Sequence, residues 1–152
     1  MYNLFKEKEV SSYEDIQVQL QEIEKCMMLT PSYRLKGLTF KRFREVFGEK
    51  HNDKLSGIYL ITNEHDEVVY VNHSEWLAKD IGEHFRQLSP MKAPLTYKMA
   101  DMLRIKPIEA REIIEDKYSV RFIVIKDIHL RSVSEIYFEL NHKAQYSNYR
   151  LQ

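Results

Sequence analysis

The sequence of 152 residues contains one cysteine, four glycines and four prolines. A single cysteine excludes an intramolecular disulfide framework and a zinc site built from several thiolates, and it suits a reducing compartment. Cys26 falls near the apolar face of a predicted helix, so we expect it to fill the core. The sequence has no apolar run near 18 residues and no recognisable signal peptide, so we expect a soluble cytoplasmic protein without a membrane partner.

The sequence also lacks a net charge, since 23 basic residues balance 23 acidic ones. This balance argues against a chain that binds its partner through an overall strongly basic surface, but the charges are unevenly distributed along the sequence. Residues 32–56 hold seven basic and three acidic side chains, whereas residues 57–91 hold two basic and six acidic ones. We therefore expect the most basic surface before residue 57 and an acidic surface after it.

Helical periodicity dominates the first third of the sequence. Ser11 and Glu14 have the spacing of a capping box, and apolar residues then recur at helical intervals up to Met27. We expect this helix to end at Thr30-Pro31. A second, shorter helix is expected over residues 39–47, with Gly48 as its end.

Four further helices are expected later in the chain. One is capped by Ser74 and runs to about Leu88, and two cover roughly residues 95–104 and 107–117, the latter entered through Pro107. Ser132 and Glu135 form another capping box, which predicts a final helix with one apolar face. Its inward residues are predicted to be Val133, Ile136, Tyr137, Leu140 and Ala144.

Three segments have the composition of β-strands. Residues 57–62 and 67–71 flank a polar loop and predict a hairpin, and residues 120–126, with the sequence VRFIVIK, predict a third strand. Strands surrounded by helices indicate an α+β fold with a small central β-sheet flanked by helices. We predict an N-terminal helical extension, residues 1–54, packed on a core domain of residues 55–152.

The core domain begins with Gly57-Ile58-Tyr59, and Tyr70 follows Tyr59 by eleven residues in the sequence YVN. With this pattern the core domain resembles the GIY-YIG endonuclease family, which has YIG at the second motif. The family pattern then continues without a gap through Ser74, Leu77, position 80 and His84. Its later glutamate maps onto Glu135 and its closing asparagine onto Asn148. The resemblance covers about residues 55–150.

The resemblance implies a metal-dependent phosphodiesterase. In the family, the first tyrosine takes a proton from the attacking water, the glutamate holds a single divalent metal such as magnesium or manganese, and an arginine binds the phosphate. By this resemblance Tyr59, Tyr70, His84 and Glu135 are the candidate catalytic residues, with Glu135 as the metal ligand. Hydrolysis also needs a positive group near the developing charge.

Two positions depart from the family pattern. Asp80 stands at the position of the arginine, which reverses the charge where a phosphate approaches, and Asn72 stands at the glycine of YIG. Losing one preorganised donor typically costs about 10² to 10³ in rate, and a carboxylate adds repulsion. Two compensations remain open, namely Lys79 as the cation, or Asp80 joining Glu135 as a second metal ligand.

Each candidate residue also has a purely structural interpretation. Aromatic residues such as Tyr59 and Tyr70 are favoured in strands, His84 lies on an apolar helical stripe, and Glu135 suits a capping box. The basic residues of the second helix, Lys41, Arg42 and Arg44, either form its solvated face or contact a substrate or an acidic partner. By the resemblance, Asn148 joins them as a substrate-binding candidate.

We therefore expect a catalytically impaired GIY-YIG nuclease-like protein. It acts as a binding module or inhibitor toward a protein partner or nucleic acid, and it needs no cofactor. The alternative is an active DNA endonuclease that uses one divalent metal. A third interpretation is a structural subunit whose N-terminal helices form a homodimer.

Overall fold

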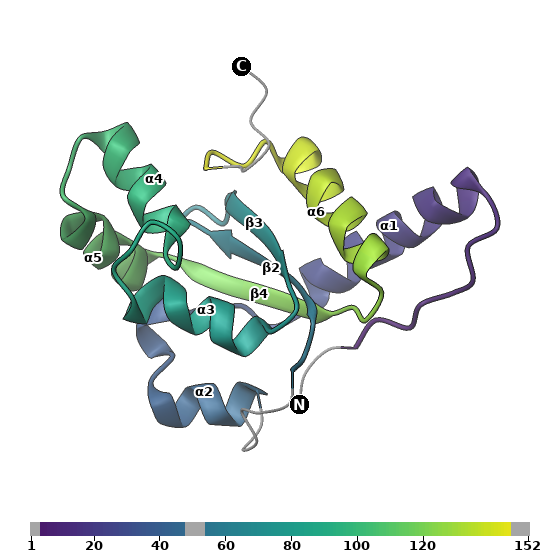
Figure 1. The fold of residues 1–152 in the computed structure, drawn as a ribbon, viewed down its shortest axis with the longest axis horizontal. Coiled ribbons are helices and arrows are strands. Elements are labelled where there is room, and N and C mark those ends of the chain that lie inside the picture. Colours follow the sequence, from purple (N-terminus) through teal and green to yellow (C-terminus); the bar gives the residue numbers. More distant parts are fainter. Residues whose placement is uncertain (1–3, 48–53, 147–152) are drawn as a thin grey trace.

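The computed structural model describes residues 4–47 and 54–146 (Figure 1). Along the chain, the elements are helix α1 (Tyr13–Leu29), strand β1 (Tyr33–Arg34), the 3-10 helix η1 (Leu35–Gly37), helix α2 (Phe40–Phe47), strands β2 (Gly57–Thr62) and β3 (Val68–Ser74), helices α3 (Leu77–Arg86), α4 (Pro94–Leu103) and α5 (Pro107–Lys117), strand β4 (Ser119–Val124) and helix α6 (Ile128–His142). The predicted α+β class, a small sheet flanked by helices, is confirmed.

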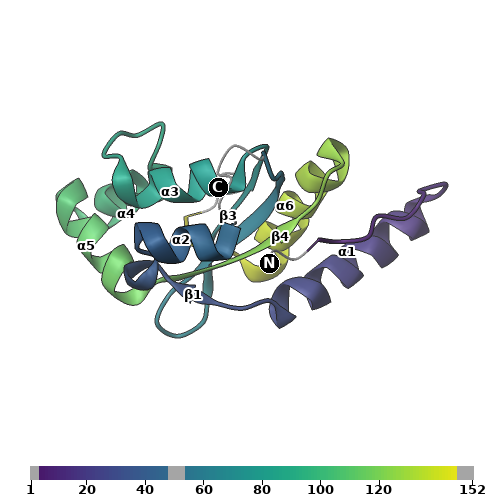
Figure 2. The ribbon, with the colours of Figure 1, turned by 90° about the horizontal axis from the view of Figure 1, so that it is seen from below.

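The four strands form one antiparallel sheet in the order β1-β4-β2-β3. Strand β2 lies between β4 and β3, and all six of its residues are buried. Both views place α2 to α5 on one side of the sheet and α1 and α6 on the other (Figure 1 and Figure 2). The GIY sequence therefore lies on a strand that is covered on both faces.

Each face of the sheet carries its own apolar core. Tyr59 and Tyr70 belong to the core beneath α3, α4 and α5. Ile58 and Leu60 point the other way, toward α1 and α6. This alternation is the ordinary period of two along a strand. It decides which candidate side chains can meet on the same side of the sheet.

The segment before residue 55 contributes to both cores. Ile23 and Met27 of α1 lie in the core under α6, and Val46 and Phe47 of α2 lie in the other. The ring of Phe47 stacks on that of Phe122 in β4, with centroids 4.7 Å apart. The segment also supplies strand β1, which the sequence did not predict because two residues carry no periodicity. The division at residue 54 stays a prediction.

Three predicted helix starts are wrong. The cap of α1 is Ser12, whose hydroxyl accepts from the Asp15 N–H, so the start is displaced by one residue from the Ser11 prediction. Ser74 is the last residue of β3, and α3 begins at Leu77 without a side-chain cap. α6 begins at Ile128, where Asp127 accepts from the Leu130 N–H, so Ser132 lies inside the helix.

The predicted inward face of the last helix is also largely wrong. Val133, Ile136 and Leu140 are 41%, 41% and 57% exposed. The buried face consists instead of Arg131, Ser134, Glu135, Phe138 and Glu139. Polar side chains replace apolar ones there because Arg131 donates to the carbonyls of Ile125 and Lys126, and Glu135 meets His73. Sequence periodicity follows hydrophobicity, and it cannot detect a face buried through hydrogen bonds.

Cys26 is exposed, so its predicted place in the core is also wrong. It precedes the buried Met27, and neighbouring residues of a helix point about 100° apart. The remaining predicted elements lie within a few residues of the observed ones, and Pro107 occupies the first turn of α5 as predicted.

Candidate functional site

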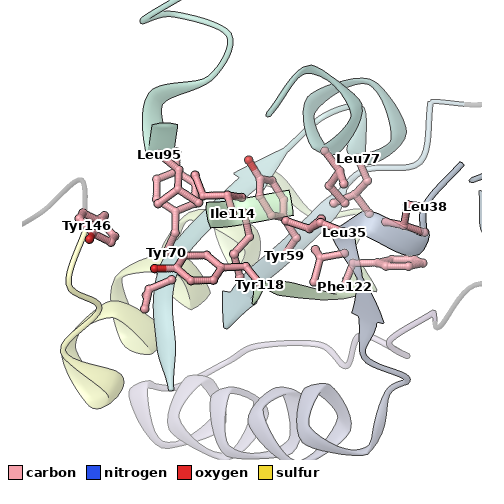
Figure 3. Packing of buried hydrophobic residues seen from close by; sticks show 14 of the residues in the cluster. Leu35, Leu38, Tyr59, Tyr70, Leu77, Leu95, Ile114, Tyr118, Phe122 and Tyr146 are labelled. Carbon is pink, nitrogen blue, oxygen red and sulfur yellow. The ribbon is translucent and has the colours of Figure 1, made fainter. Parts of the chain in front are cut away.

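The β2–β3 hairpin brings Tyr59 and Tyr70 together. Tyr59 is paired with Asn72 across the hairpin, and the rings of the two tyrosines have centroids 6.3 Å apart. Tyr59 is 0% exposed and Tyr70 is 1% exposed. Figure 3 shows both rings among apolar side chains that include Leu95 of α4 and Ile114 of α5. The two predicted catalytic tyrosines thus lie close together, beneath the helices that cover this face.

His84 of α3 completes this cluster. Its Nε2 lies 2.7 Å from the Tyr59 hydroxyl, and its ring centroid lies 5.2 Å from that of Tyr70. Asn72 Nδ2 donates to the same hydroxyl at 3.4 Å, so the Tyr59 oxygen is hydrogen-bonded to two side chains. His84 Nδ1 is buried and has no hydrogen-bond partner among the described residues.

Burial controls the protonation of this cluster. Burial first, and then the nearby guanidinium of Arg111, lower the pKa of His84 to about 4, so the imidazole is neutral near pH 7. Burial also raises the pKa of Tyr59 well above its usual value, and Tyr70, Asp80 and Glu135 add to this rise. A buried phenol that stays protonated and is hydrogen-bonded to a neutral imidazole has little capacity to take a proton from water.

Asp80 lies at the edge of this cluster. Its carboxylate accepts a hydrogen bond from the Ser74 hydroxyl, which in turn accepts from the Trp76 N–H at 2.9 Å. Asp80 is among the charges that raise the pKa of Tyr59, so its negative charge acts on the tyrosine cluster. The neighbouring Lys79 extends outward, with its Nζ 4.0 Å from Glu83. The ammonium group of Lys79 therefore lies beside Glu83, one helical turn from Lys79.

Glu135 approaches the hairpin from α6, through the edge strand β3. One of its oxygens accepts from the His73 N–H at 3.3 Å, and the other lies 3.1 Å from His73 Nδ1. His73 follows Asn72 and therefore faces the opposite side of the strand from the residue that contacts Tyr59. Glu135 is 1% exposed. A metal at this carboxylate would have to displace His73.

The described residues do not fit a bound divalent ion as they are arranged. Within residues 4–47 and 54–146, no group of three or more His, Cys, Asp or Glu side chains is placed to hold a metal ion. A divalent cation prefers several oxygen ligands, and Glu135 alone supplies one carboxylate that His73 already occupies.

Two cations near the cluster, the half-buried Lys98 and the buried Arg111, were not predicted from the sequence. Lys98 of α4 lies with its Nζ 5.8 Å from the centre of the Tyr70 ring, and burial lowers its pKa while Glu139 and Glu135 raise it. Arg111 of α5 donates to the carbonyl of Gln87 just after α3. Neither residue belongs to a recognisable motif, because helix packing rather than sequence spacing brings both to the cluster.

An open hollow of about 480 Å³ lies beside Asp80. Its lining includes Trp76, with the ammonium groups of Lys54 and Lys79 each 5.7 Å from the ring centre. His73 and Asp80 line it as well. The hollow therefore combines an aromatic surface with both signs of charge. The only tryptophan of the sequence, Trp76, could have indicated this hollow, but it is not among the candidate residues predicted from the sequence.

The predicted substrate-binding residues are separated in sequence from Tyr59 and Tyr70. Lys41 and Arg42 are exposed on α2, where Arg42 forms an ion pair with Glu45 at 3.0 Å and lies 5.7 Å from the Tyr33 ring centre. Arg44 belongs to the same helix, but its side chain is outside the described part of the structure. Asn148 lies outside the described residues altogether.

Comparison with known proteins adds no relative. No model of a known protein family matches this sequence, and neither does any curated protein. Among the described residues, no helix has both the length and the apolar character needed to cross a membrane.

Proposed function

We propose that this chain is a GIY-YIG nuclease-like protein with an impaired catalytic centre, and that it acts by binding. The binding target is a protein partner or a nucleic acid, toward which the chain serves as a binding module or an inhibitor. The observation that carries this proposal is the buried hydrogen bond between Tyr59 and His84, with the carboxylate of Asp80 nearby.

Phosphodiester cleavage needs a base that reaches the attacking water. The Tyr59 hydroxyl is fully buried and hydrogen-bonded to both His84 and Asn72. Asn72 fills space where the family has glycine, and its side-chain amide donates a hydrogen bond to the Tyr59 hydroxyl. This geometry supports a stabilised core cluster in place of a working base.

Cleavage also needs positive charge at the phosphate. Asp80 supplies the opposite sign, and its hydrogen bond with Ser74 holds it in place. A carboxylate near a phosphate is repelled more strongly in a poorly solvated site than in water. These charges support binding without turnover.

The hollow around Trp76 is the best candidate for the binding surface. Aromatic residues are enriched in protein interfaces, and mixed charges around them favour specific pairing with a partner. This combination supports a protein partner. The nucleic-acid form of the proposal is supported by Lys54 and Lys79 beside the ring, because bases stack on aromatic side chains while lysines contact phosphates.

The alternative is an active metal-dependent endonuclease. Lys98 favours it, because this cation lies over the Tyr70 ring and is affected by the charge of Glu135. It is a candidate for the positive group that Asp80 does not provide. In this alternative, the Glu135 carboxylate would release His73 and bind the metal instead.

One assay separates the two candidates. Purified protein is incubated with plasmid, single-stranded DNA and RNA in magnesium or manganese, beside the variants Glu135→Ala and Lys98→Ala. We expect no cleavage above the level of the two variants. Cleavage that either substitution abolishes would establish the alternative.

Binding is tested with a Trp76→Ala variant. Affinity capture and gel-shift experiments compare it with the unchanged protein and with a Tyr13→Ala control, which alters an exposed aromatic residue on α1. We expect the Trp76 substitution alone to weaken binding, by about tenfold or more for a central aromatic residue. Equal binding by all three proteins would exclude the hollow as the binding surface.

A further inference from the structure

Helix α6 carries two carboxylates on its buried face. Glu135 and Glu139 are one helical turn apart, so they lie on the same side of the helix. They are 1% and 3% exposed. Two buried negative charges at this spacing repel each other, and each is costly to bury unless positive charge or hydrogen bonds lie close to it. The stability of this face therefore depends on groups from other elements.

The hydrogen bonds around this face favour Glu135. Its two oxygens contact the N–H and the Nδ1 of His73, at 3.3 and 3.1 Å. Arg131 lies one turn earlier on the same face, but its guanidinium donates to two backbone carbonyls just before α6. The guanidinium is thus directed toward the start of the helix, whereas Glu139 lies in its last two turns.

Lys98 brings a positive charge to the same region from α4. The helices α4 and α6 cover opposite sides of the sheet, and β3 is its edge strand (Figure 1). The Nζ of Lys98 lies 5.8 Å from the ring centre of Tyr70 in β3 and 3.5 Å from the carbonyl oxygen of Tyr146. The Tyr146 N–H in turn donates to the Val69 carbonyl at 2.9 Å. The ammonium group therefore lies at the sheet edge, where side chains from both sides can meet.

The charge of Lys98 interacts with both carboxylates of α6. Burial lowers the pKa of Lys98, and the negative charges of Glu139 and then of Glu135 raise it. The carboxylates thus favour the charged form of the amine, and by the same interaction the ammonium group favours their ionised form. The face of the Tyr70 ring adds a weaker attraction for the cation.

From this arrangement we propose that the ammonium group of Lys98 is the built-in counter-ion of Glu139 and Glu135, and that it takes the place of a divalent metal ion. By the resemblance Glu135 is a metal ligand, yet the described residues do not fit such an ion. A cation that belongs to the chain itself accounts for this disagreement. Lys98 is thus a positioning residue, which keeps two carboxylates ionised inside the fold. This inference rests on the proposed function in one respect, namely that the centre operates without a metal.

Thermal unfolding of the full chain measures the coupling between these charges. Lys98→Met removes the charge and keeps much of the length of the side chain. We expect it to lower the unfolding midpoint by about 5 °C or more at pH 7, because the carboxylates lose their counter-ion. Adding Glu139→Gln removes one of these carboxylates, so the double variant is expected to unfold at a higher temperature than Lys98→Met alone.

Two further variants separate charge from packing. Lys98→Arg keeps the charge and is expected to lose less than Lys98→Met. Lys92→Met is the matched control, since Lys92 is exposed just before α4, and its midpoint is expected to move by less than about 2 °C. Additive effects of Lys98→Met and Glu139→Gln would overturn the proposal. If Lys98→Met does not fold, recovery of folding in the double variant supports the proposal, and an unfolded double variant overturns it.

A titration with manganese tests whether Lys98 takes the place of an ion. We expect millimolar Mn²⁺ to raise the midpoint of Lys98→Met by roughly 3 °C or more, and to change that of the unchanged protein much less. Adding Glu135→Gln to Lys98→Met is expected to remove this response. Equal shifts in the unchanged protein and in Lys98→Met, or no shift in either, would overturn the proposal.

These measurements fail separately from the proposed function. They use neither a nucleic acid nor a protein partner, so they report only on the charges at the edge of β3. Metal-dependent cleavage would overturn the impaired centre of the proposed function. Additive stabilities in a protein that does not cleave would overturn the role of Lys98 alone.

Discussion

At the scale of single residues, His84 makes stability depend on pH. The unfolded chain binds a proton at this imidazole near pH 6.5, whereas burial lowers the pKa in the folded protein to about 4. As the pH falls through this window, the unfolded state gains the proton first, and the free energy of unfolding decreases. The loss reaches up to about 3 kcal/mol below pH 4.

The His84→Gln variant isolates this contribution, because glutamine stays neutral. Urea denaturation at several pH values is expected to show that the stability advantage of the unchanged protein over the variant shrinks as the pH falls from 7 to 4. His65→Gln is the control, since His65 is exposed. A pH-independent difference between the unchanged protein and His84→Gln would show that the folded protein binds this proton normally.

Gly57 is required by close packing rather than by an unusual backbone angle. A Cβ atom at this position would lie 2.1 Å from the carbonyl oxygen of Ile123 and 2.9 Å from a methyl group of Leu77. Backbone of the neighbouring strand cannot move aside cheaply. Gly57→Ala is therefore expected to lower the free energy of unfolding by about 2 kcal/mol or more.

Gly37→Ala provides the comparison, because nothing lies within 4 Å of a Cβ built there. Its midpoint of urea denaturation is expected to stay close to that of the unchanged protein. Equal midpoints for the two alanine variants would mean that β2 and β4 separate easily at Gly57. The glycine of the GIY sequence thus has a structural explanation that is independent of catalysis.

At the scale of secondary structure, mutations can test where α6 begins, because the predicted cap is Ser132 and the observed cap is Asp127. Asp127 Oδ1 accepts from the Leu130 N–H at 2.8 Å, whereas Ser132 Oγ donates to the Ile128 carbonyl inside the helix. Asp127→Ala is expected to cost about 1 kcal/mol of stability and Ser132→Ala close to none. Thermal unfolding followed by circular dichroism measures both, and the reverse order would restore the predicted start at Ser132.

The positions of helices and strands were predicted from the sequence more accurately than the side of a helix that is buried. The hairpin of β2 and β3 and the extents of α4 and α5 follow from periodicity and from turn residues, which act locally. The buried face of α6 did not follow, since Glu135 and Arg131 are buried through partners that lie far away in the chain or on the backbone. The predicted caps Ser11, Ser74 and Ser132 were wrong as well, because Ser12 caps α1, α3 has no side-chain cap and Asp127 caps α6.

At the scale of the candidate site, Tyr59, Tyr70 and His84 lie together because one hairpin and the next helix fix their spacing, whereas their assignment to the family's site stays a prediction. The contributions of Lys98 and Arg111 were unpredictable, since they depend on how α4 and α5 pack. Whether the cluster performs chemistry stays a prediction. The pKa values of Tyr59 and His84 arise from burial, which a sequence does not reveal.

For the whole molecule, the question is whether residues before 55 fold as a separate unit. Ile23 of α1 is 0% exposed and packs in the core under α6, while Trp76 packs against the core on the opposite face of the sheet. The segment also pairs with the edge of β4, because the Phe5 N–H donates to the Val124 carbonyl at 2.9 Å. The residues before 55 are therefore bound to the sheet itself as well as to its core.

We therefore expect one cooperative unfolding transition for the whole chain. Ile23→Ala removes a buried side chain and is expected to cost about 2 to 5 kcal/mol, shifting the fluorescence of Trp76 and the far-ultraviolet circular dichroism to the same lower midpoint. Val18→Ala, which alters an exposed residue of the same helix, should shift neither. If Ile23→Ala melted helical signal early while the Trp76 transition kept its midpoint, the N-terminal helices would be a separate unit docked on an independently stable domain.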